Sequence, residues 1–201
     1  MIELRPEVKE ILEKYINLIE ANNWDKFFET IQNDWVPQIV GKVANTLESC
    51  SIFPLPYMTF IPEGYFYISS ITEFVVPQNI QRICYRAFAG SDLEKVHITS
   101  NVYDVNEQAF VDCDFLKTVI MNEGVRYIDN GVFYSCTALE SVILPRSLQR
   151  IGHNVFNGCD NLTRIYYKGT TADWNKVVNR EFINEGSYVR RIICSDGELV
   201  L

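Results

Sequence analysis

The sequence predicts an α+β fold: a solenoid of about five short units, with an α-helical cap at its N-terminal end and a helix and hairpin cap at its C-terminal end. Three observations lead to this prediction. One segment of 22 or 23 residues recurs four times between Ile80 and Thr170. Each copy contains alternating apolar and polar residues, which is typical of a short strand with one buried face. Helical periodicity occurs before the repeats and again just after them.

The copies are aligned by aromatic and cysteine residues. Three phenylalanines recur every 23 residues, and three cysteines share that spacing: Phe110, Phe133, Phe156 and Cys113, Cys136, Cys159. Phe88 precedes the first of them by 22 residues, because the first copy is one residue short. A half-unit comes earlier still, with apolar residues at Ile71, Phe74 and Val76. A period of this length predicts a solenoid, in which each unit buries its apolar face on its neighbours.

Each unit has two halves. The first half ends in alternation, as in Leu139, Val142 and Leu144, and predicts a short strand. In the second half an isoleucine is followed five residues later by a phenylalanine, as in Ile128 and Phe133. Glycine and other turn-prone residues interrupt this half, so we expect a tight helical turn there and no long helix.

The repeat resembles the BspA-type leucine-rich repeat, whose pattern runs roughly I-x-x-I-G-x-x-A-F-x-G-C-x-x-L-x-x-V-x-I-P. The match covers about residues 60–170, and several residues fall in register with the pattern: Pro77, Ala87, Phe88, Ala109, Phe110, Cys113, Cys136, Pro145, Gly158 and Cys159. The resemblance implies a leucine-rich-repeat solenoid that binds proteins on its strand face.

Residues 1–59 are predicted to form a helical capping module. Apolar residues recur at helical spacing in three segments, which begin near Pro6, Asn23 and Pro37. Such a stripe suits either a partner-binding groove or a packed core, and we expect a core that covers the open end of the solenoid. Three prolines among large apolar residues in 51–62 predict a packed junction with the repeats, which occupy 60–170.

Residues 171–201 are predicted to form the C-terminal cap. Thr171 is expected to cap a short helix with Asp173 in its first turn. The apolar side chains of this segment are expected to face inward: Trp174, Val177 and Val178. A strand, a Ser-Asp-Gly turn and a final strand follow. The segment also resembles the terminal cap of BspA-type arrays, which implies that the chain ends naturally here; the matching residues are Gly169, Trp174, Cys194, Asp196 and Gly197.

Catalytic and metal-binding patterns are absent from the sequence. None of the six cysteines forms a Cys-x-x-Cys pair, so we expect the periodic cysteines to stack in the core as free thiols. The ligand spacings of a zinc site are missing. The two histidines, His97 and His153, lie near no nucleophile motif, and no glycine-rich phosphate loop occurs. We therefore expect no enzymatic activity, metal or cofactor.

Charge and hydropathy restrict the partners. With 26 acidic against 18 basic residues the net charge is −8, which disfavours binding to a phosphate backbone. No apolar run is long enough to span a membrane. The opening MIELRPEVKE does not resemble a secretory signal peptide, so we expect a cytoplasmic protein. Many BspA-type proteins are exported to the cell surface, and this start departs from that pattern.

Three functions fit these observations. The first is a module that binds a protein partner through the strand face. The second is a small acidic effector or inhibitor, encoded by a phage or a bacterium, whose helical module blocks a basic site on a host protein. The third is a fragment of a surface adhesin that has lost its leader. The repeat pattern favours the first.

Strand alternation identifies a candidate binding surface. Residues between two inward-facing positions of a strand must point outward. They form a largely apolar column: Val75, His97, Ile120, Ile143 and Tyr166. A second outward column is expected to provide a polar rim: Glu73, Lys95, Thr118, Ser141 and Arg164. The apolar column suits a docking stripe for a protein partner or for self-association, but strand propensity or cover by the helical module would also account for it.

Overall fold

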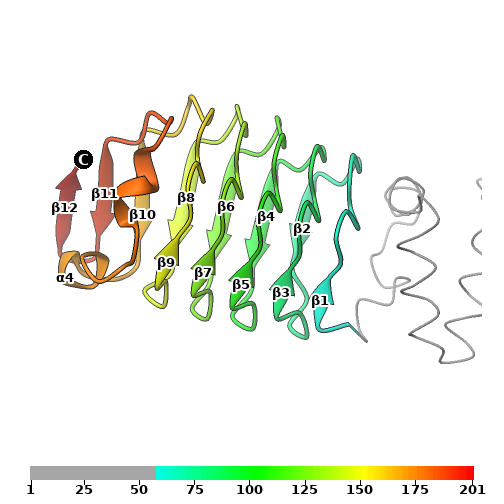
Figure 1. Cartoon of the computed structure of the whole chain (residues 1–201), viewed down its shortest axis with the longest axis horizontal. Helices are drawn as coiled ribbons and strands as arrows, with labels where there is room; N and C mark the ends of the chain where they lie inside the picture. The colour runs from blue at the N-terminus through cyan, green and yellow to red at the C-terminus, as the bar shows by residue number, and fades with distance from the viewer. Residues whose placement is uncertain (1–57) are drawn as a thin grey trace, which may run out of the picture.

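The computed structural model describes residues 58–201, and the predicted helices of the N-terminal module lie outside them. The repeats form a β-solenoid in which each turn contributes one short and one long strand (Figure 1). The short strands are β1 (Phe60–Ile61), β3 (Arg82–Ile83), β5 (Asp104–Val105), β7 (Tyr127–Ile128) and β9 (Arg150–Ile151). The long strands are β2 (Glu73–Val75), β4 (Lys95–Ile98), β6 (Thr118–Met121), β8 (Ser141–Leu144) and β10 (Arg164–Tyr167).

The strands build two sheets. The short strands form a five-stranded parallel sheet in the order β1-β3-β5-β7-β9. The long strands form the second sheet, which continues through β11 (Arg191–Cys194) and ends at β12 (Gly197–Val200). Equivalent residues of successive turns pair in register, for example Val96 with Val119 and Val119 with Val142. Residues 22 or 23 apart in sequence are therefore direct neighbours in space.

The solenoid has about six turns, one more than predicted. The expected half-unit is a complete turn, because Ile61 and Phe66 stand 22 residues before Ile83 and Phe88 and are equally buried. At the other end β11 pairs in parallel with β10 and adds a sixth long strand. The final hairpin is thus part of the sheet.

The second half of each turn is built from β-turns, where a tight helical turn was expected. Two positions per turn have positive φ, and they stack into two columns: Gly64, Arg86, Gln108, Gly131, Asn154 and Ile68, Gly90, Asp112, Ser135, Gly158. The two left-handed residues of each turn are four residues apart and prevent a continuous right-handed helix there. Helix within residues 58–201 is limited to α4 (Thr171–Trp174) and the 3₁₀-helix η3 (Arg180–Asn184). The α+β class and the helical C-terminal cap are therefore not confirmed, and the N-terminal helical cap lies outside the described residues. Neither α4 nor η3 could span a membrane.

The core repeats one arrangement along the axis. Five phenylalanine rings stack in a column with centroids 4.8 to 5.6 Å apart: Phe66, Phe88, Phe110, Phe133 and Phe156. Beside them the three periodic cysteines are free and fully buried, as predicted. Burial raises the pKa of the Cys136 thiol well above its ordinary value. Two serines occupy the same column in the first turns, Ser69 and Ser91, and both are buried.

The segment after the repeats differs in detail from the prediction. Thr170, and not Thr171, is the N-cap of α4; its hydroxyl accepts a hydrogen bond from the Asp173 amide. Trp174 and Val177 are buried as expected, but Val178 is 56% exposed. The helix ends after four residues, and Val178 forms a parallel bridge with Arg150. Because side chains alternate in extended backbone, Val177 points inward and Val178 outward.

Candidate protein-interaction surface

The outer face of the long-strand sheet carries the candidate site. In β4, β6 and β8 buried and partly exposed residues alternate, so every second side chain points away from the core. The five predicted residues form a continuous ladder, the outer column: Val75, His97, Ile120, Ile143 and Tyr166. Val75 is 64% and Tyr166 38% exposed, while the three middle residues shield one another. The structure therefore brings these residues together on one surface.

The outer column extends one rung further than the sequence analysis proposed. Ile193 of β11 pairs with Tyr166 and is partly exposed. On its other side it pairs with Glu198 of β12, which ends the apolar run with a charge. The signal for Ile193 was the alternation in Arg191–Cys194, which matches the repeat strands. It was missed because Ile193 stands 27 residues after Tyr166, and this offset does not follow the repeat period.

A polar column runs beside the apolar one, and we call it the polar rim. Glu73, Lys95, Thr118 and Ser141 pair rung by rung. At the C-terminal end Arg164 pairs with Arg191 of β11, which joins the rim as a further member. The rim thus begins with an acidic residue beside a basic one, continues through two hydroxyl residues and ends in two arginines.

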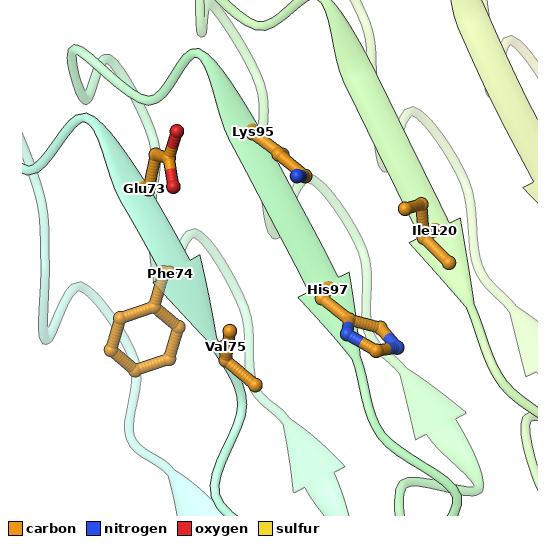
Figure 2. Close-up of a pocket in the computed structure, with 6 residues that line it drawn as sticks. All are labelled: Glu73, Phe74, Val75, Lys95, His97 and Ile120. Atoms are coloured by element: carbon orange, nitrogen blue, oxygen red, sulfur yellow. The ribbon is translucent and has the colours of Figure 1, made fainter.

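A shallow hollow lies at the N-terminal end of the face (Figure 2). It has a volume of about 120 Å³, and its lining residues are Glu73, Phe74, Val75, Lys95, His97 and Ile120. Figure 2 shows Val75, His97 and Ile120 in one row, with Glu73 and Lys95 in the row beside it. The Nε2 atom of His97 is buried and makes no hydrogen bond within residues 58–201. The hollow is too small for most organic ligands but suits one or two side chains of a partner.

Reactive groups do not converge on this face. In the part of the chain that the structure describes, no three His, Cys, Asp or Glu side chains are arranged to hold a metal ion. His153 lies far along the chain from His97 and contacts Glu185, with 3.3 Å between Nδ1 and Oε2. Its ring also stacks on Phe182 at 3.8 Å between centroids. This geometry orients His153 at the surface of the last turn.

Solved structures of bacterial proteins match parts of this chain. The pneumococcal vaccine antigen PcpA is 20% identical with a TM-score of 0.49, over 55% of this chain and 27% of that one. A leucine-rich repeat protein from Eubacterium ventriosum is 15% identical with a TM-score of 0.45, over 70% and 50% of the two chains. The matches thus span about a quarter and about half of those proteins. A search of curated proteins found no match.

The repeat pattern itself identifies the family. The family model for the BspA type leucine-rich repeat region matches residues 59–182 in six copies. These residues cover more than half of the chain and include all five pairs of short and long strands. The match ends before β11, so the sixth long strand lies beyond it. The chain belongs to the BspA-type leucine-rich repeat family.

Proposed function

We propose that this protein is a non-catalytic interaction module that binds a protein partner through the outer face of its long-strand sheet. Leucine-rich repeat families are generally modules for protein–protein interaction. The observation that carries the proposal is the outer column, a run of mostly apolar side chains that crosses five neighbouring strands on an accessible surface. The polar rim lies directly beside it, as in interfaces with an apolar centre and a polar margin.

The fold does not need apolar residues in the outer column. Inward-facing neighbours already provide the core, since Val96, Val119 and Val142 are fully buried. Strand propensity favours β-branched and aromatic residues on either face, so it accounts for each outer residue taken singly. It does not account for a ladder in which four of the five rungs are apolar, because contiguous apolar patches on soluble monomers are limited and mark interaction sites.

Two substitutions test the proposal. Ile143→Asp places a charge at the centre of the outer column, and Tyr166→Ala removes its largest side chain. We expect each to weaken partner binding by about 2 kcal/mol or more, as at interface hot spots. Val178→Asp and Tyr103→Ala are matched controls, because both residues are exposed and belong to the short-strand side of the solenoid. Val178 forms a bridge with Arg150 of β9, and Tyr103 directly precedes β5. Binding is measured by affinity capture from cells of the source organism, with quantification of each captured protein.

The outcomes separate the alternatives. The proposal is supported if the wild type and both controls capture a partner that Ile143→Asp and Tyr166→Ala fail to capture. Equal capture by all variants contradicts it. A large fall in the melting temperature of Ile143→Asp also contradicts it, because the column would then belong to the core. Analytical ultracentrifugation identifies self-association, in which a second copy of the chain is the partner.

A second candidate is a small acidic effector or inhibitor that blocks a basic site on a host protein. The net charge of −8 favours it. Under this hypothesis the acidic residues of 1–50 make the contact, so a variant with those residues neutralised would lose binding while Ile143→Asp would retain it. The same capture experiment therefore distinguishes the two candidates.

A further inference from the structure

Two arginines lie side by side at the C-terminal end of the polar rim. Arg164 and Arg191 are in-register neighbours on the parallel strands β10 and β11, and both are exposed. Like charges placed directly opposite each other in a sheet destabilise it. The fold therefore retains here an arrangement that is unfavourable for its own stability.

Carboxylates of the chain compensate only part of this charge. The Nη1 atom of Arg191 lies 3.3 Å from Oε1 of Glu198 on β12. Arg164 has no ion pair within residues 58–201, and its guanidinium carbon lies 5.9 Å from the ring centroid of Tyr166. Arg190 adds a further positive charge one residue before β11, where its Nη1 donates to two backbone carbonyls. An excess of positive charge therefore remains over β10 and β11.

The rest of the face carries no excess of positive charge, since the exposed Glu140 lies there as well. Glu73 and Lys95 are in-register neighbours of opposite charge at the N-terminal end. Just outside the rim Lys117 forms an ion pair with Glu94, with 2.8 Å between Nζ and Oε2. The middle rungs, Thr118 and Ser141, carry no charge. On a chain with a net charge of −8, the basic end of the rim is thus a local feature.

We propose that the partner is a protein segment with apolar side chains along the outer column and carboxylates at the end that lies over β10 and β11. The inference rests on the proposed function and adds the chemistry and the direction of the bound segment. A guanidinium pairs with a carboxylate through two parallel hydrogen bonds, so Arg164 and Arg191 offer a geometric match as well as charge. Tyr166 and Ile193 lie beside the arginines and supply the adjoining apolar contact.

The test selects peptides from random sequences, so the partner does not have to be identified first. A random peptide library displayed on phage is selected on the immobilised full chain, and enriched peptides are then synthesised and titrated by fluorescence anisotropy. We expect enriched sequences to combine apolar residues with aspartate or glutamate at one end. Their affinity should fall as salt concentration rises, because exposed charge pairs are screened.

Charge reversal assigns the site. Arg164→Glu/Arg191→Glu is expected to weaken binding of the acidic peptides by about tenfold or more. We expect Arg164→Gln/Arg191→Gln to lose a smaller part of the binding affinity. This variant introduces no negative charge, so it controls for misfolding caused by the new glutamates. Arg126→Glu is the matched control, since Arg126 is exposed and precedes the short strand β7. It should bind like the wild type.

Two results would overturn the inference. The first is a set of enriched peptides that depend on Ile143 but lack acidic residues, or that bind Arg164→Glu/Arg191→Glu as tightly as they bind the wild type. This result refutes the acidic partner and leaves the proposed function standing. Enriched peptides that bind Ile143→Asp unchanged refute both, because the outer column would then not be the binding surface. Loss of acidic-peptide binding in Ile143→Asp and in the double variant, with Arg126→Glu unaffected, supports the inference.

Discussion

The Sγ atom of Cys136 lies 3.1 Å from the backbone carbonyl oxygen of Phe110 in the preceding turn, to which it donates a hydrogen bond. The other two periodic cysteines repeat this contact: Cys113 with the carbonyl of Phe88 and Cys159 with the carbonyl of Phe133. The column is therefore a series of buried donors that link one turn to the next. Ser69 and Ser91 occupy the same column in the first turns, but the Ser91 hydroxyl lies 3.4 Å from Sγ of Cys113 and the Ser69 hydroxyl has no hydrogen-bond partner within residues 58–201.

Replacements at Cys136 test this link. Cys136→Ala removes the donor and leaves a small cavity, and we expect it to lower the free energy of unfolding by about 2 kcal/mol. Cys136→Ser retains a donor that can reach the Phe110 carbonyl, so it should cost less, about 1 kcal/mol. Urea unfolding followed by circular dichroism provides both values. If Cys136→Ser proved much less stable than Cys136→Ala, the carbonyl would not be an effective partner.

The phenylalanine column should contribute strongly to stability. Phe110 is fully buried between Phe88 and Phe133, with ring centroids 4.9 and 5.3 Å away. We expect Phe110→Ala to lower the free energy of unfolding by about 3–5 kcal/mol. Phe115→Ala is the matched control, because its ring is 57% exposed, and it should change stability by less than about 1 kcal/mol. Similar losses for the two variants would argue against a continuous core.

Ile68 is the most strained residue of the left-handed columns. It is β-branched, has φ of +51° and occupies the column in which Gly90 and Gly158 also stand. A left-handed conformation costs roughly 1–2 kcal/mol for such a residue and nothing comparable for glycine. Its side chain is 52% exposed, so little packing is lost on removal. We expect Ile68→Gly to raise the free energy of unfolding by about 1 kcal/mol.

Asp92→Gly provides the control for this prediction. Asp92 is exposed and lacks a positive φ, so glycine there adds only unfolded-state entropy and should destabilise by about 0.5–1 kcal/mol. Differential scanning calorimetry measures both variants. Destabilisation of the same size by Ile68→Gly would contradict the strain argument.

Asp173 should make stability depend on pH in the acid range. Hydrogen bonds from the hydroxyl and amide of Thr170, with help from Lys176, lower the pKa of Asp173 from 3.8 to about 2. The unfolded carboxyl therefore takes up its proton first as pH falls, and its stabilising contribution is present above about pH 4 and lost towards pH 2. We expect Asp173→Asn to melt below the wild type at neutral pH and close to it near pH 2.

The measurement is a series of melting curves between pH 7 and about pH 2. Asp160→Asn controls for the loss of one negative charge at an exposed position of the last repeat. A constant gap between the wild type and Asp173→Asn across the series would show that the aspartate acts through its shape and not through its charge.

Much of the fold could be predicted because the repeat is local and regular. Each strand needs only a few residues, and alternation alone decides that Val119 is buried while Ile120 points outward. The helical expectation for the second half of the unit was wrong because the number of turn residues does not reveal their φ angles. Non-glycine residues such as Arg86 and Gln108 adopt left-handed conformations that composition does not predict.

The period, the identity of the stacked core residues and the outer column follow from the sequence alone, because in-register parallel strands place residues one period apart beside each other. The neighbours of the last repeat depend on tertiary packing instead. Arg191 and Ile193 stand 27 residues after Arg164 and Tyr166, since α4 and η3 interrupt the period. The pairing of β11 with β10 is a long-range contact that local spacing does not encode. It extends the apolar column to a sixth strand and places Arg191 beside Arg164.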